Sequence, residues 1–200
     1  MARAGRGQGQ EILLGGSFGT EEYPEYHPNF NHQWTTVTSD GAFVEHLLAF
    51  YFCWEYPSFA SLSKDHFLED FKTKNERYCS SLLVNALLAL GCRFSEQAPA
   101  RTDPGKSITA GDHFFAEAEK LLAAEENRHS LTTIQALGLM SLREASCGRS
   151  SNGIYFSSQS IRLAVEMGLH LEVRIGNTED AEKEHAVRCA TFWGAFSLDL

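Results

Sequence analysis

The 200-residue sequence has few of the features that mark an enzyme, a metal site or a membrane protein. It contains no phosphate-binding P-loop, no G-x-G-x-x-G motif after a strand, no H-E-x-x-H pair and no C-x-x-C pair. The longest apolar run, residues 47–54, is far shorter than the roughly 20 residues that cross a bilayer. No signal peptide is visible, because the basic N-terminus is followed only by the short apolar run 12–14. We therefore predict a soluble intracellular protein that is not an enzyme and has no catalytic, cofactor-binding or metal-binding residues.

The five cysteines are scattered along the chain. The count is odd and no two cysteines lie close together in the sequence; they are Cys53, Cys79, Cys92, Cys147 and Cys189. Zinc modules need tight clusters of the C-x2-C type. We therefore expect buried free thiols in a reducing compartment, and no zinc ligands in this chain.

Basic residues are outnumbered as well. The sequence contains 17 Lys and Arg residues and 26 Asp and Glu residues, which gives a formal net charge of −9. A protein that binds nucleic-acid phosphates needs a basic patch. The charge therefore disfavours DNA binding by this chain, although it does not exclude DNA binding by another segment of a longer protein.

Residues 1–40 show no sustained hydrophobic period and contain six glycines. We predict a flexible or disordered segment there, followed by one helical domain over residues 41–200. Residues 15–19 match the G-x-S-x-G nucleophile pattern, but that turn requires a helix immediately after it. Because Thr-Glu-Glu-Tyr-Pro follows at residues 20–24, we interpret the match as chance.

The rest of the chain has the period of helices, with apolar residues three and four positions apart. The predicted helices cover residues 41–55, 64–72, 79–94, 112–126, 131–147, 154–168 and a last stretch from 178 onward. No strand pattern of useful length appears. The sequence thus predicts an all-α fold, an irregular array of amphipathic helices packed as antiparallel pairs without a sheet.

The spacing of apolar residues predicts which side chains of two helices face inward. Residues 79–94 are apolar nearly all round, which is typical of a central buried helix, and Asn85 would need hydrogen-bond partners there. In the helix 41–55 we expect the following side chains to face inward: Phe43, Val44, Leu47, Leu48, Tyr51 and Trp54.

Local signals also predict where helices begin and end. The expected N-caps are Asp40, Ser130 and either Asn177 or Thr178. Residues 109–112, Thr-Ala-Gly-Asp, resemble a capping box with Asp in place of Glu or Gln. Glycines just past two apolar runs are typical of left-handed C-caps; they are Gly148 and Gly168.

Two histidines share a helix face with a carboxylate four residues on: His66 with Asp70, and His113 with Glu117. Such a pair can begin a metal site, but no third ligand is evident. We therefore interpret both as solvent-exposed surface pairs.

The predicted helices 131–147 and 154–168 form a hairpin with charges embedded in it. These charges are Arg143 and Glu144 in the first helix, and Arg162 and Glu166 in the second. Any of them that faces inward should pair across the hairpin and fix its register.

An ordered set of segments resembles the fungal-specific transcription factor domain, the middle homology region of zinc binuclear cluster activators of the xylanolytic-activator-like and nitrogen-assimilation-activator-like group. The resemblance covers roughly residues 43–200. Its pieces, in order, are residues 48–54 and 56–59, 67–71, 78–90, 110–115 and 118–122, 133–137 through 143–148, 161–164 through 167–170, and 184–188 leading into 191–194.

The resemblance implies an all-helical domain without a catalytic centre, which modulates a separate DNA-binding and activation region in the nucleus. Zinc and DNA binding are implied for the complete protein, through a six-cysteine cluster. This sequence lacks that cluster, and it also lacks the family's basic linker, its dimerisation coil and the C-terminal half of the domain. The expected partners are other parts of a transcription factor or co-regulators. The alternative is a small helical ligand-binding protein or enzyme with an aromatic-lined pocket.

Overall fold

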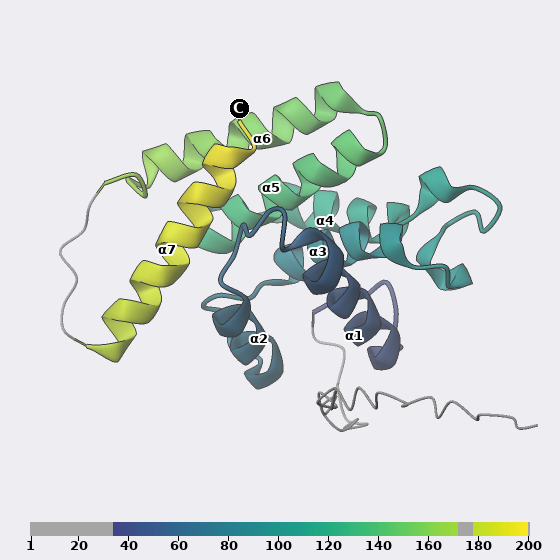
Figure 1. The fold of residues 1–200 in the computed structure, drawn as a ribbon, viewed down its shortest axis with the longest axis horizontal. Coiled ribbons are helices and arrows are strands. Elements are labelled where there is room, and N and C mark those ends of the chain that lie inside the picture. Colours follow the sequence, from purple (N-terminus) through teal and green to yellow (C-terminus); the bar gives the residue numbers. More distant parts are fainter. Residues whose placement is uncertain (1–33, 172–177, 200) are drawn as a thin grey trace, which may run out of the picture.

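The computed structural model of the protein describes residues 34–171 and 178–199. Within these residues the chain forms seven α-helices and no strand, which confirms the predicted all-α fold. The helices, labelled in Figure 1, are α1 (Gly41–Phe50), α2 (Lys64–Thr73), α3 (Ser81–Gly91), α4 (Asp112–Ala124), α5 (Leu131–Ser146), α6 (Ser150–Glu166) and α7 (Glu179–Ser197). A π-helical turn, Tyr51–Glu55, continues α1, and short 3-10 turns lie between α3 and α4.

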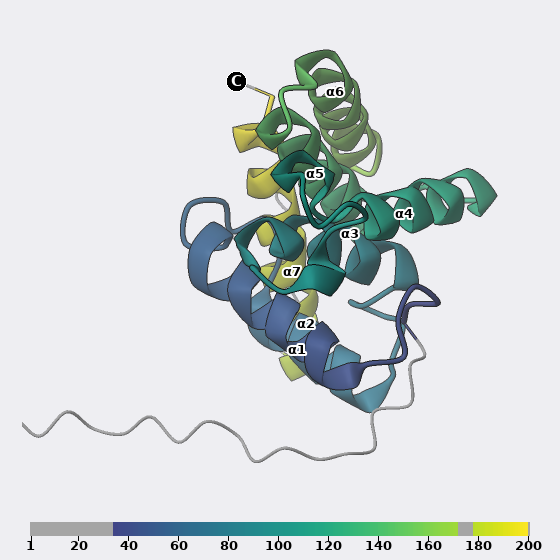
Figure 2. The ribbon, with the colours of Figure 1, turned by 90° about the vertical axis from the view of Figure 1, so that its right-hand side faces the viewer.

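Helix α3 is the centre of the fold, as its apolar sequence predicts. Residues 82–91 are all buried, and α3 packs against α1, α4 and α5 (Figure 2). Its first turn is capped by the hydroxyl of Ser80, which accepts from the N–H of Leu83 at 3.2 Å. A helix without a polar face is stable in water only when neighbours cover it on every side.

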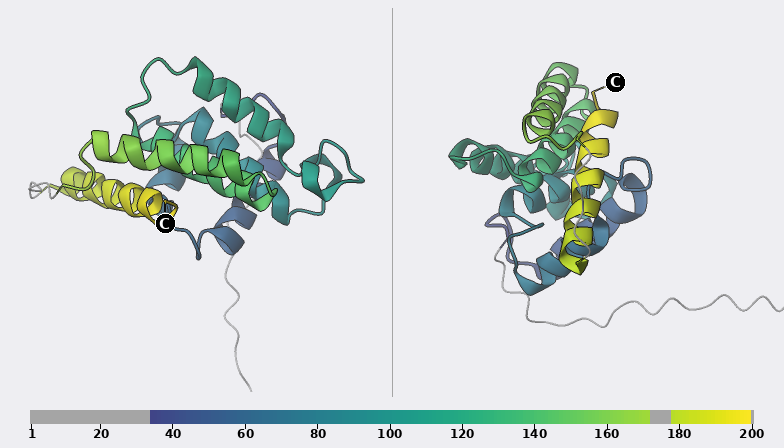
Figure 3. Two further views of the ribbon diagram at one scale, coloured as in Figure 1. Left: turned by 90° about the horizontal axis from the view of Figure 1, so that it is seen from above. Right: turned by 90° about the vertical axis from the view of Figure 1, so that its left-hand side faces the viewer.

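Helices α5 and α6 form the predicted antiparallel hairpin, and α7 packs against both (Figures 1 and 3). The link between α5 and α6 is shorter than expected, because α6 already begins at Ser150 rather than near residue 154. Helix α6 ends in a Schellman motif: the N–H of Leu169 donates to the carbonyl of Ala164, and that of Gly168 to the carbonyl of Val165, each at 2.9 Å.

Most predicted helix ends are confirmed. Asp40 accepts from the N–H of Phe43 at 3.0 Å, and Ser130 and Thr178 each accept from the N–H three residues on. Gly148 and Gly168 have φ of 76° and 66°, the left-handed conformation that favours glycine at a helix end.

The predicted inward face of the first helix is right except at its end. Phe43, Val44, Leu47, Leu48 and Tyr51 are buried, but Trp54 is 61% exposed. The cause is the π-helical turn, in which the N–H of Tyr56 bonds the carbonyl of Tyr51. A π turn advances by less than 100° per residue, so the regular helical spacing fails beyond residue 51.

The predicted capping box at residues 109–112 does not form. The hydroxyl of Thr109 instead donates within its own loop, to the carbonyls of Asp103 and Lys106 at 3.0 and 2.8 Å. The N-cap of α4 is Gly111, with φ of 75°. A Cβ atom at Gly111 would lie 2.1 Å from the carbonyl oxygen of Ala89, so only glycine fits where α4 begins against α3.

Two residues that precede the predicted boundary at residue 40 are also buried. Trp34 and Thr35 are only 6% exposed, and they pack on the helices. The expectation for residues 1–33, including the G-x-S-x-G match at 15–19, lies outside the described residues. No helix in the described part of the chain is long and apolar enough to cross a membrane.

Candidate functional site

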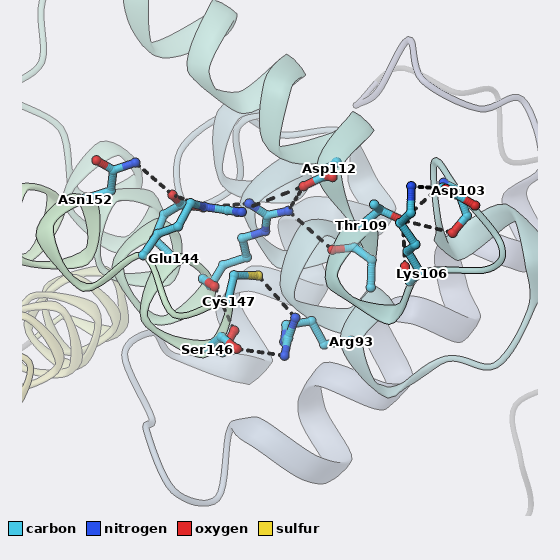
Figure 4. A network of polar contacts seen from close by, with 12 residues as sticks. Arg93, Asp103, Lys106, Thr109, Asp112, Glu144, Ser146, Cys147 and Asn152 are labelled. Carbon is cyan, nitrogen blue, oxygen red and sulfur yellow. Dashed lines mark hydrogen bonds and ion pairs between the residues drawn. The ribbon is translucent and has the colours of Figure 1, made fainter.

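Five polar side chains meet where three helix ends converge. They come from the N-terminus of α4, the C-terminus of α5 and the start of α6, and we call them the hairpin network: Asp112, Arg143, Glu144, Arg149 and Asn152 (Figure 4). The short link between α5 and α6 brings Arg149 back over α5, where its N–H bonds the carbonyl of Glu144 at 3.0 Å.

Glu144 is the centre of the hairpin network. Its side chain is 1% exposed, and it accepts from Arg143 Nη1 at 2.6 Å, from Arg149 Nε and Nη2 at 2.7 and 2.6 Å, and from Asn152 Nδ2 at 3.0 Å. Donors from both helices of the hairpin thus satisfy one buried carboxylate. A buried carboxylate without such donors is costly, so this arrangement holds the two helices in one register.

Arg143 extends the hairpin network to α4. Its side chain is also 1% exposed; it forms an ion pair with Asp112 and donates to the carbonyl of Ala110 at 3.4 Å. Its guanidinium lies 4.5 Å from the ring centroid of Phe115, a cation–π contact. One buried arginine therefore joins α4 to the hairpin.

The electrostatics keep the network charged. Burial alone would raise the pKa of Glu144, but hydrogen bonds from Arg149, Asn152 and Arg143 outweigh burial and lower it to about 2. The hydrogen bond to Glu144 raises the pKa of Arg149. At neutral pH the carboxylate is ionised and fully hydrogen-bonded, so it has the properties of a structural lock rather than those of a general acid or base.

A second contact fastens the end of α5 to α3. Arg93, in the 3-10 turn after α3, donates to the carbonyl of Ser146 at 2.9 Å and to Cys147 Sγ at 3.2 Å (Figure 4). The end of α5 is thereby held from three sides, by α3, α4 and α6.

The hypothesis that inward charges pair across the hairpin is confirmed for Glu144, which pairs with Arg149 at the start of α6. It is wrong for Arg143, whose ion pairs are with its neighbour Glu144 on α5 and with Asp112 of α4. The other charges, Arg162 and Glu166, lie on the surface at 62% and 45% exposure, with 3.5 Å between Nε and Oε1. Glu166 also contacts His129 at 3.2 Å.

Both predicted surface pairs are wrong. Asp70 is buried and accepts from the N–H of Tyr78 at 2.7 Å, while His66 Nδ1 lies 2.7 Å from Ser63 Oγ. Glu117 accepts from Thr36 at 2.9 Å and from Lys120 rather than from His113. Each carboxylate accepts from a group outside its own helix, the backbone N–H of Tyr78 for Asp70 and the hydroxyl of Thr36 for Glu117, and helical spacing cannot show such partners.

With this geometry in view, comparison with known proteins identifies the family. Residues 48–200 match the fungal specific transcription factor domain. The chain belongs to this family. The domain is similar to the nitrogen assimilation transcription factors nirA of Emericella nidulans, at 48% identity over 84% of the chain, and nit-4 of Neurospora crassa, at 47% over 83%.

The fungal transcription factor domain is also 30% identical, over 84% of the chain, to the notoamide biosynthesis transcriptional activator notL' of Aspergillus versicolor. The matched region spans only 19% of nirA and 16% of nit-4. No solved structure matches the chain.

The residues of this fungal transcription factor domain do not fit a zinc cluster. All five cysteines are free, and among the described residues no three His, Cys, Asp or Glu side chains converge as metal ligands. Two of the expected buried thiols differ: Cys53 is exposed and Cys189 is half-buried.

Three members of the hairpin network are not among the charges that the sequence predicts to pair. Asp112 falls in the predicted capping box, and Arg149 and Asn152 fall in the predicted link between two helices. The usable signal for Arg149 was its place five residues after Glu144, beside a glycine that reverses the chain. Asp112 lies 31 residues from Arg143, and no local pattern links them.

Proposed function

We propose that this chain is the regulatory domain of a fungal transcription factor of the nitrogen-assimilation type, acting in the nucleus on transcription by RNA polymerase II. The observation that carries the proposal is the 48% identity to nirA over 84% of the chain. Identity at about half of the positions, over most of the chain, supports a shared role as well as a shared fold.

The proposed role is non-catalytic. The domain, with residues 41–200 as its helical part, masks or exposes an activation surface through contacts with other parts of the transcription factor or with co-regulators. DNA and zinc binding belong, in this proposal, to a zinc cluster elsewhere in the complete protein. The hairpin network supports the role because it joins α4, α5 and α6 into a rigid body that can present such a surface.

A chimera tests the proposal. The part of nirA that aligns with this chain is replaced by residues 34–200 of the chain, and a reporter under a nirA-responsive promoter is measured in Emericella nidulans. We expect the chimera to retain the reporter's response to the nitrogen source, and a matched chimera carrying the surface change Glu45→Gln to behave alike. A chimera that accumulates normally but gives an output independent of the nitrogen source would contradict the proposal.

A further inference from the structure

Helix α7 carries an apolar stripe on the side that faces away from the fold. We call it the outer stripe, and its residues are Ala186, Cys189, Trp193 and Phe196. Trp193 is 62% and Phe196 42% exposed, and their rings meet edge to face with centroids 5.8 Å apart. Ala186 is exposed and Cys189 is half-buried. Two large aromatic side chains thus lie side by side in water, an arrangement that is typical of an interaction surface.

The rest of the described fold packs on the opposite side of α7. The buried residues of this helix are Val187, Thr191, Gly194 and Ala195, and the helix contacts α5 and α6. At 3.6 residues per turn, the outer stripe is centred roughly 180° around the helix from these residues. Figure 3 shows α7 running along the outside of the described part of the chain, so its outward side is open to a further helix.

The spacing of the outer stripe is that of a helix seam. Its positions, 186, 189, 193 and 196, follow one another at intervals of three, four and three residues. Apolar residues at alternating intervals of three and four form the contact line of a coiled coil, where each side chain packs against a facing helix. The outer stripe therefore has the pattern that a second helix requires.

The sizes of the side chains favour a second α7 in the antiparallel direction. The two small residues of the outer stripe precede the two large ones along the helix. An antiparallel copy places Cys189 opposite Trp193. The same register places Ala186 opposite Phe196, because both pairs are centred on position 191. A parallel copy instead sets Trp193 against Trp193 and leaves a gap between the two Ala186 side chains, and packing of large against small residues fills space better.

The charges beside the outer stripe fit the same direction. His185 and Asp199 flank it on one side, and neither is buried. They lie seven positions before and after residue 192, within one residue of the axis that the stripe defines. In an antiparallel pair the imidazole of each copy therefore comes close to the carboxylate of the other, whereas a parallel pair sets the two Asp199 carboxylates against each other.

The size of the contact indicates a weak dimer. A fully buried Phe or Trp side chain removes about 150–250 Å² from water, so the exposed parts of Trp193 and Phe196 supply roughly 200 Å² per copy. A stable interface buries about 800 Å² per partner. We therefore expect a dissociation constant on the order of 100 µM rather than a permanent dimer.

We infer that the outer stripe is a self-association surface, through which two copies of this chain pair by antiparallel α7 helices about a two-fold axis near residue 191. The small half of each outer stripe covers the aromatic half of the other. Because both copies use the same patch, the contact is closed and stops at two chains. The inference goes beyond the proposed function and does not depend on it.

Sedimentation equilibrium of the full chain, from about 5 µM to about 1 mM, tests the inference. We expect a monomer–dimer equilibrium without larger species. Trp193→Ala should weaken dimerisation at least about tenfold, because it removes a central aromatic anchor. The matched control is Trp54→Ala: Trp54 is 61% exposed but lies in the π-helical turn after α1, outside the outer stripe, and its loss should change the dissociation constant less than about twofold.

A second variant separates the antiparallel register from general stickiness. Cys189→Trp enlarges the apolar surface, but it sets a tryptophan opposite Trp193 of the second copy, so dimerisation should weaken at least about tenfold. Combining Cys189→Trp with Trp193→Ala restores a large residue opposite a small one, and the dissociation constant should return to within about threefold of the wild type. Circular dichroism of each variant checks that its helix content equals that of the wild type.

Three results would overturn the inference. The first is a wild type that remains monomeric at about 1 mM. The second is tighter association of Cys189→Trp, or growth beyond two chains, since either would mean that exposed apolar surface associates without a register. The third is a monomeric chain whose Trp193 becomes protected from hydroxyl-radical oxidation only within the nirA chimera, because another segment of the transcription factor would then cover the outer stripe.

Discussion

Glu144 shows how much one buried carboxylate can depend on its donors. Its pKa is lowered from an ordinary 4.5 to about 2, so the ionised form stabilises the fold above the ordinary value, and that stabilisation is lost as the pH falls toward 2. We expect Glu144→Gln to lower the free energy of unfolding by about 3 kcal/mol at neutral pH, since one pKa unit corresponds to about 1.4 kcal/mol.

Urea unfolding of wild type and Glu144→Gln at several pH values measures this effect. The difference between the two proteins should shrink between about pH 5 and about pH 2. The control is Glu45→Gln on the exposed face of α1, whose difference from wild type should stay within about 0.5 kcal/mol. A gap for Glu144→Gln that does not change with pH would show that the carboxylate is not held ionised.

Gly194 lies where α7 approaches the backbone of Ser61 closely. A Cβ atom at this position in α7 would lie 2.5 Å from Ser61 Cα, which is a backbone clash. Gly194→Ala should lower the free energy of unfolding by about 1–3 kcal/mol, although alanine is the better helix former by about 1 kcal/mol.

Thermal and urea unfolding of Gly194→Ala test the close approach. Ala186→Ser on the exposed face of the same helix should change stability by less than about 0.5 kcal/mol. If Gly194→Ala instead stabilised the protein, α7 would not press against the segment around Ser61.

At the scale of helices, the sequence predicts correctly the features that have a local cause. The caps at Asp40, Ser130 and Thr178 each depend on a hydroxyl or carboxylate and an N–H three residues away. It failed at Thr109 and Trp54, where a loop contact and a π-helical turn change the local geometry. Neither change leaves a periodic signal in the sequence.

The α5–α6 hairpin allows a direct comparison of a buried and an exposed ion pair. We expect a double-mutant cycle of Glu144→Gln with Arg149→Met to give a coupling free energy of about 1–2 kcal/mol, since Glu144 is buried although Arg149 is 39% exposed. The corresponding cycle for Arg162 and Glu166 on α6 should give less than about 0.5 kcal/mol, because both side chains are largely in water. Equal coupling in the two cycles would contradict the role given to the hairpin network.

Across the whole molecule, the five cysteine side chains differ in their exposure to solvent. Cys53 is exposed and Cys189 half-buried, whereas Cys79, Cys92 and Cys147 are buried. Burial raises the pKa of the Cys79 and Cys92 thiols, so both are poor nucleophiles in the folded protein.

A thiol reagent such as DTNB should therefore react first with Cys53, and with Cys79 and Cys92 only as the protein unfolds. Cys53→Ser should abolish the fastest phase, and Cys79→Ser should leave it unchanged. A fast phase that survives in Cys53→Ser would mean that another thiol is accessible in the folded state.

The sequence alone determined the class of the fold, the central position of α3 and most of the helix ends, because apolar periodicity and capping act over one to four residues. It also predicted that any charge of the hairpin that faced inward would pair across it, as Glu144 does. Only the tertiary structure decided that Asp112 completes the hairpin network, that Thr35 meets Asn85 and that Thr36 meets Glu117. These contacts join residues 31 to 81 positions apart. Their partners are chosen by how the helices pack, and packing places side chains together that no local pattern connects.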